Sequence, residues 1–373
     1  MKQSRIVVIG AGNAGSVVAN SLSKQGFNVT VIEPSDYHLY QPGLVDVIVG
    51  DESPENVIKP VNKILDPRIE LVKDKAIKVL PEERKVITSG NKEINYDYLV
   101  ISPGVQNVKG KLPAFHTLDE AINLRKMVEG FSGKTIIVGY YGVIKCPAAP
   151  FELAFLLKQK FPKANVTLLN PVAQPPELQK PMAEKLGKRS KELGIEVVRG
   201  AKIRDIDIQN KVIEVEDGQK FQYDLALIDT PIKVSSEFSN LTDNSGFIPV
   251  DKQSLQLKGY DDVYVIGDAT NIMLPPKTGA LAHYEALHVV RSIINQVHGY
   301  GKTQFDGSAM CAVYGSGSDG FFVYMNYYKS KAYGPSPIFR SAKKAFQGLY
   351  WLSLKGMVDP FLEFSKRFFS GGP

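Results

Sequence analysis

Short runs of apolar residues, separated by glycine turns or by polar stretches with helical spacing, recur along the chain and predict an α/β fold. The run 6–9 predicts a buried strand that enters a glycine turn, and residues 16–24 have the spacing of a helix. Gly26 ends this helix before a second strand at 28–32. No run of about 18 apolar residues occurs in the sequence, so we expect no membrane-spanning helix.

The amino-terminal residues allow two interpretations, a secretory signal or the first strand of the fold. Lys2 and Arg5 precede apolar residues, which is the order found in a signal. The stretch 5–10 (RIVVIG) fits better as a short buried strand that enters a glycine turn. We therefore expect no cleaved signal peptide and a fold that starts near the first residue.

The strand at 6–9 is followed by GAGNAG, which has the GxGxxG spacing of a dinucleotide-binding turn. The first glycine permits the tight turn, the second lets the backbone approach a pyrophosphate, and the third allows the helix to pack on the strand. The helix amino terminus then offers free N–H groups to the phosphates. A glycine-rich turn of an unrelated α/β protein is the alternative. The residues expected to contact the dinucleotide here are Gly10, Gly12, Asn13, Ala14 and Gly15.

Glu33 closes the second strand, in the position of a ribose ligand. Its carboxylate can accept hydrogen bonds from the ribose of the adenosine, and its charge disfavours a 2′-phosphate there. Strand, glycines, helix, strand and acid occur in this order within 33 residues, and this order predicts a dinucleotide site.

Three later segments indicate which dinucleotide is bound. Residues 95–104 (NYDYLVISPG) resemble the return strand of flavoproteins with two dinucleotide domains, and 223–230 is a weaker second copy. Residues 262–269 (DVYVIGDA) resemble the flavin-binding segment of the same proteins, in which the Asp matching Asp268 hydrogen-bonds the ribityl chain of FAD. The resemblance covers about residues 4–300 and implies FAD as the cofactor.

This resemblance implies an α/β fold with two Rossmann-like dinucleotide-binding domains in tandem. The FAD domain is expected in two pieces, 1–112 and 243–300, around a second Rossmann-like domain at 113–242. Residues 301–373 are expected to form a carboxyl-terminal region with an amphipathic helical tail. Further contacts with FAD are expected from Ala76, Ser102, Pro103, Gly104, Gly267, Asp268, Lys277, Thr278 and Gly279.

The second domain departs from the pattern of an NADH-binding domain. After an apolar run at 135–138 the chain reads GYYGVIKC, where a second GxGxxG is expected. Tyr140 and Tyr141 place bulk where the backbone must approach phosphate, and Ile144 occupies the third glycine position. We expect a domain that has kept its fold and lost its nucleotide; a degenerate but working NADH site is the alternative.

The composition of the chain limits the kinds of functional site that we expect. Hydrophobic residues make up 43% and charged residues 23%, which is ordinary globular usage and disfavours disorder. The chain has two cysteines, Cys146 and Cys311, too few for a disulfide scaffold or a four-cysteine zinc or iron–sulfur site. The five histidines show no metal-ligand spacing, so we expect no metal. The net charge of +6 is too small to indicate a nucleic-acid partner, and we expect none.

The segment around the first cysteine, 145–152 (KCPAAPFE), resembles that of the sulfide dehydrogenases. These are the sulfide:quinone oxidoreductases and the flavoprotein subunit of flavocytochrome c sulfide dehydrogenase. They have a partner cysteine late in the chain, where this chain has Cys311, and residues 274–279 (LPPKTG) resemble a segment of theirs near the flavin. The resemblance implies that Cys146 and Cys311 form a redox pair. Two inert buried cysteines are the alternative.

The implied reaction is the oxidation of sulfide, with two electrons passing through FAD to a membrane quinone and sulfur leaving as polysulfide or elemental sulfur. A disulfide can be opened by HS⁻, which leaves one persulfide and one thiolate. We expect a helix amino terminus and Lys145 to stabilise the Cys146 thiolate, and Glu152 to act as proton acceptor. His283 is a candidate proton relay or a structural histidine. The third cysteine of some relatives, in some cases linked to the flavin, is absent.

The tail from 337 onward has apolar residues at helical spacing, with a basic side. Residues 338–369 include six basic and two acidic side chains, which is an excess of 6 − 2 = +4. Basic amphipathic helices with aromatic residues suit a membrane interface, so we expect a peripheral (monotopic) membrane protein that takes quinone from the bilayer. A helical pair that caps the core or forms a dimer contact is the alternative, which leaves a homo-oligomer open. The residues considered for a quinone channel are Phe321, Phe346 and Tyr350.

Three rival functions stay open at the level of sequence. The flavoprotein subunit of a soluble sulfide dehydrogenase would pass its electrons to a cytochrome. A type II NADH:quinone oxidoreductase would share the fold and the tail. A binding or assembly module would keep FAD without turnover.

Overall fold

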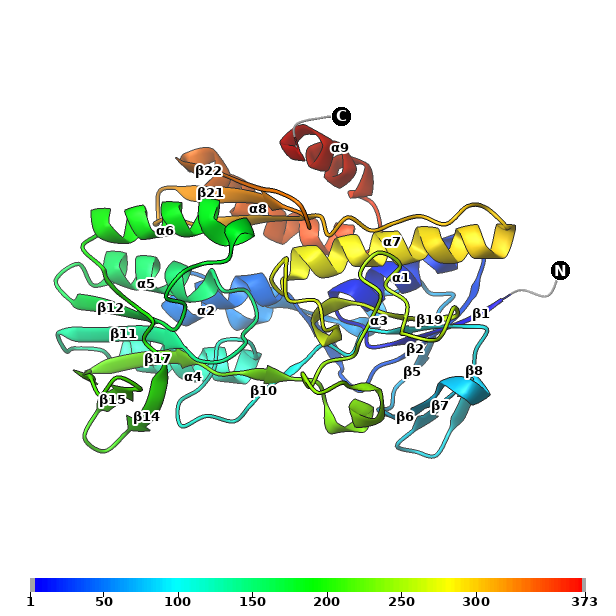
Figure 1. The fold of residues 1–373 in the computed structure, drawn as a ribbon, viewed down its shortest axis with the longest axis horizontal. Helices are drawn as coiled ribbons and strands as arrows, with labels where there is room; N and C mark the ends of the chain where they lie inside the picture. Colours follow the sequence, from blue (N-terminus) through cyan, green and yellow to red (C-terminus); the bar gives the residue numbers. More distant parts are fainter. Residues whose placement is uncertain (1–3, 371–373) are drawn as a thin grey trace.

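The computed structural model describes residues 4–370, in which two parallel sheets lie side by side below an antiparallel sheet (Figure 1). The first sheet is entirely parallel, with the strand order β19-β9-β1-β2-β5. Because β19 comes from a distant part of the chain, two chain pieces build this sheet, as the sequence predicts. Its strands are β1 (Arg5–Ile9), β2 (Asn28–Ile32), β5 (Glu70–Val72), β9 (Tyr98–Ile101) and β19 (Val263–Val265).

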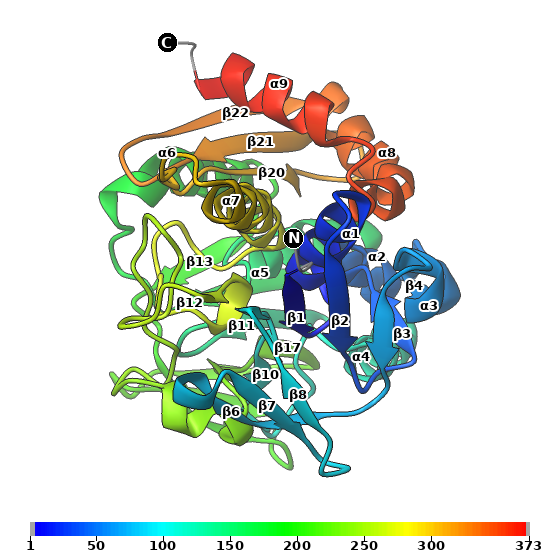
Figure 2. The same ribbon diagram turned by 90° about the vertical axis from the view of Figure 1, so that its right-hand side faces the viewer.

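Helices α1 (Asn13–Lys24) and α7 (Gly279–His298) pack against each other beside this sheet (Figures 1 and 2). Helix α1 buries its apolar side chains, as the predicted helical spacing requires. The Thr278 hydroxyl caps α7 by accepting from the Leu281 N–H at 3.2 Å, and Gly299 ends the helix in the left-handed conformation. Helix α1 follows the carboxyl end of β1, and the Asn13 side chain bonds the Gly279 carbonyl at the start of α7. Both helices therefore begin at the carboxyl edge of the sheet, where parallel sheets bind ligands.

The second sheet is also parallel, with the order β13-β12-β11-β17. Helix α5 (Ala149–Lys160) packs on β11 and β12, and α6 (Lys180–Glu192) on β13. This confirms the prediction of two dinucleotide-binding folds in tandem; their predicted borders stay a prediction. The strands of this sheet are β11 (Thr135–Tyr140), β12 (Asn165–Asn170), β13 (Glu196–Arg199) and β17 (Leu225–Asp229).

Within residues 4–370, four small antiparallel sheets and three α-helices complete the two domains. Two of these sheets have only two strands each, β3 (Tyr37–Leu39) with β4 (Ile58–Pro60) and β10 (Gln106–Asn107) with β18 (Ile232–Lys233). Helix α2 contacts α4 and α5 and so joins the first domain to the second. The helices are α2 (Leu44–Val49), α3 (Val61–Ile64) and α4 (Leu118–Glu129). The strands of the other two sheets are β6 (Ala76–Leu80), β7 (Lys85–Thr88), β8 (Glu93–Asn95), β14 (Ile203–Asp207), β15 (Val212–Val215) and β16 (Lys220–Gln222).

The carboxyl-terminal region forms an antiparallel sheet of β20 (Ala309–Tyr314), β21 (Gly320–Met325) and β22 (Ser330–Ser336). The sequence predicts β21 from its apolar run but not the two strands that flank it. Helix α8 (Pro337–Ser353) packs on this sheet, and α9 (Asp359–Ser370) contacts β21 above it (Figure 2). Among residues 4–370, none of the helices has the length and hydropathy needed to cross a bilayer.

One buried apolar cluster runs through all three sheets, with Val8, Val138 and Phe321 as members. The domains and the carboxyl-terminal sheet therefore share a core. The candidate site lies where they meet.

Candidate functional site

The glycine turn between β1 and α1 has the geometry that its sequence predicts. Gly10 has φ +92°, and a Cβ there would lie 2.4 Å from the Ser102 carbonyl oxygen. A Cβ on Gly15 would lie 1.9 Å from the Gly10 carbonyl oxygen, so only glycine fits at these two positions. By contrast, a Cβ on Gly12 would meet no described atom within 4 Å. The backbone at Gly12 is therefore open to a ligand.

Helix α1 begins directly after this turn with no side-chain cap and no acidic residue in its first turn. The N–H groups of its first residues have no acceptor within the helix and carry the positive end of its dipole. This arrangement fits the pyrophosphate of a dinucleotide. Gly10, Gly12, Asn13, Ala14 and Gly15 would hold that group.

Glu33 lies at the end of β2, beside the turn. Its carboxylate accepts hydrogen bonds from the backbone N–H groups of Ala11 and Ser35, each at 2.7 Å. Glu33 therefore holds the glycine turn in shape, which the sequence does not reveal. A carboxylate has lone pairs for further donors, so its predicted role as a ribose ligand stays a prediction.

The other predicted FAD segments meet this turn at the carboxyl edge of the sheet. The Asn13 side-chain amide donates to the Gly279 carbonyl at 2.6 Å and links the turn to the start of α7. The Ser102 hydroxyl donates to the Ile9 carbonyl at 2.8 Å. Pro103 and Gly104 follow directly beyond β9, and Gly104 has φ +66°. Segments 95–104 and 262–269 thus lie side by side on β9 and β19, whereas the weaker copy at 223–230 lies on β17 of the second sheet.

Asp268 lies in the short turn Gly267–Ala269 that ends β19. The Gly267 N–H donates to Oε2 of the buried Glu285 at 2.5 Å. Burial raises the pKa of Glu285 to about 8, and Oε1 of this residue has no partner among the described residues. Ala76 begins β6, just beyond the end of β5, and its contact with a cofactor stays a prediction.

Lys277 is buried before α7 and is tied to the neighbouring loop. Its ammonium donates to the Thr270 carbonyl at 2.6 Å and lies 4.3 Å from the centre of the Phe247 ring. Burial lowers the pKa of Lys277 to about 8, although Asp268 opposes this shift. Lys277 therefore fixes the shape of the segment that leads into α7.

Cys146 and Cys311 are both hydrogen-bonded to residues 277–278. The Cys146 N–H donates to the Lys277 carbonyl at 2.8 Å, and the Cys311 side chain is hydrogen-bonded to Thr278. Cys146 lies in the loop before α5 with φ +42°, which is rare for a residue other than glycine. Cys311 lies on β20. Both thiols are free and half-buried, and the charge of one would act on the other.

The predicted low pKa of Cys146 is wrong. Burial, the Cys311 thiol and Glu152 together raise the pKa of Cys146, and burial raises that of Cys311 to about 11. Cys146 lies three positions before the first residue of α5, so it is not part of the helix. Lys145 is buried, and the charge that acts on it most strongly is that of Asp268. The cation that acts on the two thiols is Lys343 from α8.

Glu152 lies in the first turn of α5, close to this pair. It forms an ion pair with Lys343, and its carboxylate accepts from the Tyr314 N–H at 2.7 Å. Burial raises the pKa of Glu152, while Lys343 opposes that shift. A buried carboxylate and a buried ammonium therefore act on the two half-buried thiols, and the role of Glu152 as proton acceptor stays a prediction.

A further charged cluster adjoins this site and is not predicted from the sequence. Asp46 on α2 accepts from the Tyr314 hydroxyl at 3.1 Å and forms an ion pair with Lys344. Lys343 lies 4.2 Å from the centre of the Tyr314 ring. The sequence places Lys343 and Lys344 on the basic side of the tail helix, and the structure pairs both of them with carboxylates of the two domains. Their adjacency on a polar helix face gives no sign of this.

His283 and the candidate quinone-channel residues have structural surroundings. His283 is buried, with Nδ1 3.3 Å from the Asn13 side-chain oxygen and Nε2 3.6 Å from Asp359. Phe321 is buried in the core, and Tyr350 is buried with its hydroxyl oxygen 2.7 Å from Nε2 of His38. Phe346 is partly buried, with its ring centre 6.3 Å from that of Tyr350. A channel along them stays a prediction.

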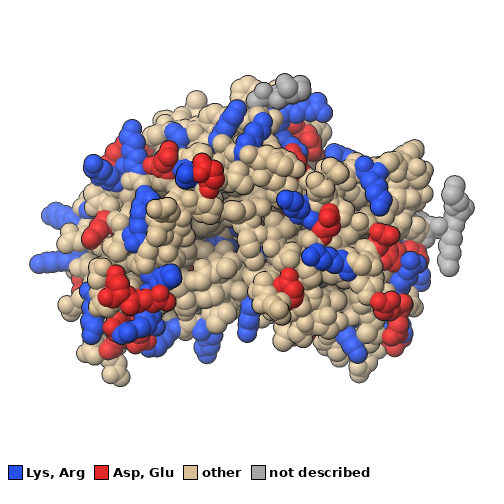
Figure 3. All heavy atoms as spheres, viewed as in Figure 1, with Lys and Arg blue, Asp and Glu red and all other residues tan. Residues whose placement is uncertain are grey.

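The apolar surface of the tail is on α9 and its approach. Phe361, Phe364 and Phe368 are each more than 60% exposed and lie on one face of α9. Ile338 at the start of α8 and Met357 before α9 are also exposed. Basic and acidic side chains are intermixed on the face shown in Figure 3, so the positive charge does not gather there in one patch.

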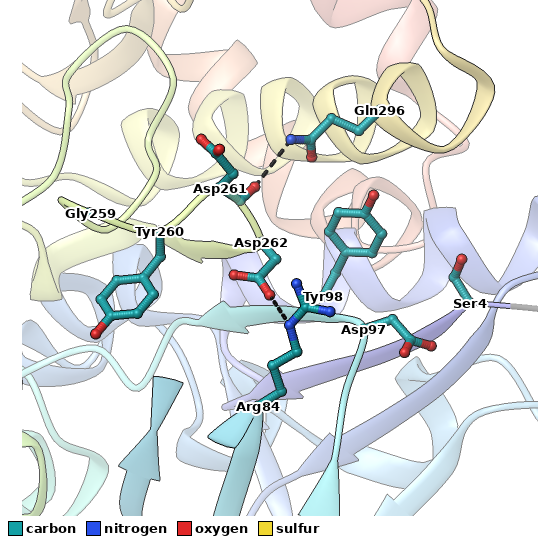
Figure 4. Close-up of a pocket in the computed structure, with 9 residues that line it drawn as sticks. All are labelled: Ser4, Arg84, Asp97, Tyr98, Gly259, Tyr260, Asp261, Asp262 and Gln296. Atoms are coloured by element: carbon teal, nitrogen blue, oxygen red, sulfur yellow. Dashed lines mark hydrogen bonds and ion pairs between the residues drawn. The ribbon is translucent and has the colours of Figure 1, made fainter. Parts of the chain in front are cut away.

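A hollow of about 530 Å³ lies elsewhere, at the amino edge of the first sheet (Figure 4). It is lined by Arg84, which pairs with Asp262 at 2.7 Å, and by Gln296, which donates to the Asp261 carbonyl at 3.1 Å. Because parallel sheets bind ligands at their carboxyl edge, this hollow is separate from the candidate redox site.

Comparisons with known proteins show the family and the fold of the chain. A family model described as pyridine nucleotide-disulphide oxidoreductase matches residues 4–290. The chain is 29% identical to the mitochondrial sulfide:quinone oxidoreductase of Dictyostelium discoideum over 340 residues, covering 83% of this chain and 75% of that protein. It is 26% identical to the Mus musculus enzyme of the same name over 306 residues, covering 74% and 68%. The solved structure of the Aquifex aeolicus sulfide:quinone oxidoreductase superposes with a TM-score of 0.87 at 19% identity, covering 98% of this chain and 95% of that one.

Proposed function

The chain belongs to the pyridine nucleotide-disulphide oxidoreductase family of FAD-dependent enzymes, and we propose that it acts as a sulfide:quinone oxidoreductase. One observation carries the proposal: Cys146 and Cys311 both attach to residues 277–278, at the carboxyl edge of the FAD-domain sheet. The chain's only two cysteines are thus placed where this fold binds its cofactor.

In the first step, sulfide reacts with the two cysteines in their disulfide form. HS⁻ attacks one cysteine sulfur, the Cys146–Cys311 bond breaks, and its electron pair leaves on the other sulfur as a thiolate. A new sulfur–sulfur bond forms on the attacked cysteine, which becomes a persulfide. When bound, FAD supplies an acceptor for two electrons that a membrane quinone can reoxidise. Once the persulfide proton is lost, transfer of two electrons to that acceptor would re-form the Cys146–Cys311 bond and break the bond to the outer sulfur, which leaves as polysulfide or elemental sulfur.

In this step Lys343 stabilises the negative charge of the thiolate, and Glu152 accepts the proton. The Lys343 ammonium lowers the pKa of both thiols, so it stabilises the thiolate that the step releases. The Glu152 carboxylate is buried beside the pair, and its raised pKa suits it to accept the persulfide proton. Since Glu152 is already bound to Lys343, a proton taken by the carboxylate weakens this ion pair and frees the ammonium for the thiolate.

We assign the electron acceptor to the membrane because of the exposed side chains of α9. Its exposed phenylalanines form an apolar stripe on a helix that also carries Lys366 and Arg367, as in helices that lie in a lipid interface. A cytochrome acceptor would not need this stripe. The protein is thus proposed to be a peripheral membrane enzyme.

The test uses the FAD-loaded enzyme under anaerobic conditions. Sulfide alone should bleach the flavin absorbance within mixing time, and a soluble quinone should restore it. Cys146→Ser and Cys311→Ser should keep FAD and lose the bleaching at least a hundredfold. Val143→Ser, a change in the exposed part of the same loop, should leave it intact. Bleaching at the unaltered rate in both cysteine variants would overturn the proposal.

A further inference from the structure

The buried His38 connects the glycine turn to the carboxyl-terminal helix α8. It lies in β3 (Tyr37–Leu39), with Nδ1 2.8 Å from the Ala11 carbonyl oxygen and Nε2 2.7 Å from the Tyr350 hydroxyl. A carbonyl oxygen only accepts hydrogen bonds, so Nδ1 carries the proton. Burial lowers the pKa of His38 to about 4, so the ring is neutral and Nε2 accepts from Tyr350. The direction of both hydrogen bonds is therefore fixed.

Ala11 is the middle residue of the glycine turn, and its peptide groups are held on both sides. Its carbonyl also accepts from the Ser16 hydroxyl at 2.8 Å, and its N–H donates to Glu33 at 2.7 Å. Ser16 and Glu33 belong to the strand–helix–strand unit that contains the turn. His38 is oriented from outside this unit, by Tyr350 of α8.

Helix α8 is tied to α1 at a second point. The Asn20 side-chain amide donates to the Leu354 carbonyl at 2.7 Å, and the Lys24 ammonium donates to the Lys355 carbonyl. These two carbonyls lie at the end of α8, where helix carbonyls lack partners within the helix. Trp351 adds an edge contact with the His38 ring, with the ring centres 5.8 Å apart. The segment directly after α8 is therefore bonded to α1, and Tyr350 of α8 is linked to the turn before α1 through His38.

We propose that Tyr350 is a positioning residue for the dinucleotide turn, and that docking of α8 and binding of FAD are coupled through His38. Without the Tyr350 hydroxyl, Nε2 of His38 would be a buried acceptor with no donor, and the ring would lose one of the two hydrogen bonds that orient it. The Ala11 peptide would then lose order at the point that faces the pyrophosphate. By reciprocity, FAD that orders the turn also stabilises the docked helix.

The coupling follows from FAD binding and does not depend on the sulfide reaction, so either can fail without the other. The first test is the FAD dissociation constant of Tyr350→Phe, read from the fluorescence of released FAD. We expect about tenfold weaker binding, because one buried hydrogen bond is lost. Tyr333→Phe is the matched control, because its hydroxyl bonds the Phe369 carbonyl at 3.4 Å within the same region and should leave FAD affinity unchanged.

The second test needs no variant. Hydrogen exchange of the unaltered apoprotein should slow on FAD addition at residues 346–354 of the tail as well as at residues 10–16. In Tyr350→Phe the protection of the tail by FAD should be reduced, and residues 10–16 should exchange faster even without FAD. FAD affinity within twofold of the unaltered protein in a folded variant, or no protection of 346–354 by FAD, would overturn the coupling.

Discussion

At the scale of single residues, two opposite charges act on the two half-buried thiols of the candidate redox site. Glu152 raises and Lys343 lowers the pKa of both Cys146 and Cys311. Burial outweighs Lys343, so both pKa values lie above the ordinary value for a thiol. The reactive thiolate therefore depends on the balance between a carboxylate and an ammonium that also bind each other.

This balance predicts opposite effects for two substitutions. Glu152→Gln removes the negative charge, lowers the thiol pKa values and should speed alkylation of the reduced enzyme by iodoacetamide at pH 8. Lys343→Met removes the positive charge and should slow it. One pKa unit changes the thiolate fraction about tenfold at a pH well below the pKa, so we expect about tenfold in each direction. Effects of the same sign in both variants would contradict this account.

Glu285 predicts a pH dependence of stability. Its pKa is raised from an ordinary 4.5 to about 8 in the folded protein, so only the unfolded chain gains from its ionisation between these values. The contribution of Glu285 to the free energy of unfolding is fully present below about pH 4.5. It falls by roughly 1.4 kcal/mol per pH unit as the pH rises towards 8.

Glu285→Gln keeps an oxygen acceptor for the Gly267 N–H and cannot ionise. The free energy of unfolding of this variant, relative to the unaltered protein, should therefore be higher at pH 8 than at pH 5. Urea denaturation at both pH values measures it. An equal difference at the two pH values would show that Glu285 titrates normally.

At the scale of elements, sequence predicts what is local and misses what joins distant segments. The glycine turn, α1 and the capped start of α7 are encoded within short stretches, and the structure has each of them. The pairing of Lys343 with Glu152 joins residues 191 positions apart, and that of Tyr314 with Asp46 joins residues 268 apart. No local pattern carries such contacts. The charge pattern of the tail therefore does not reveal that Lys343 and Lys344 pair with Glu152 and Asp46.

Helix α9 is the part of the tail that we propose to contact the membrane, because its exposed face is apolar. Phe361→Ser, Phe364→Ser and Phe368→Ser together should lower binding to liposomes that contain anionic lipid by about two orders of magnitude or more. Each buried phenylalanine contributes roughly 1.5–3 kcal/mol, and every 1.4 kcal/mol is about tenfold in affinity. Ile208→Ser, at an exposed apolar residue of the second domain, is the control. Vesicle sedimentation measures binding, and unchanged sedimentation of the triple variant would remove α9 from the interface.

At the scale of the whole molecule, the two dinucleotide-binding folds differ in how their first helix begins. In the first, β1 ends at Ile9 and α1 begins at Asn13, with no acidic residue in its first turn. In the second, β11 ends at Tyr140 and α5 begins only at Ala149, with Glu152 in its first turn. The longer connection carries Cys146, and the Tyr140 side chain is buried against Asn170, its hydroxyl at 2.8 Å. The second fold thus holds a thiol and a carboxylate where a nucleotide-binding fold holds phosphate.

This difference predicts that NADH will not reduce the flavin. A carboxylate in the first turn of α5 repels a pyrophosphate, and the helix does not begin at the end of the strand as the close approach requires. Anaerobic enzyme mixed with NADH should keep its oxidised flavin spectrum over minutes, whereas the same preparation mixed with sulfide should bleach at once. Dithionite, which needs no binding site, is the control that the flavin can be reduced. Bleaching by NADH as fast as by sulfide would favour an NADH:quinone oxidoreductase, because the second fold would then still bind its nucleotide.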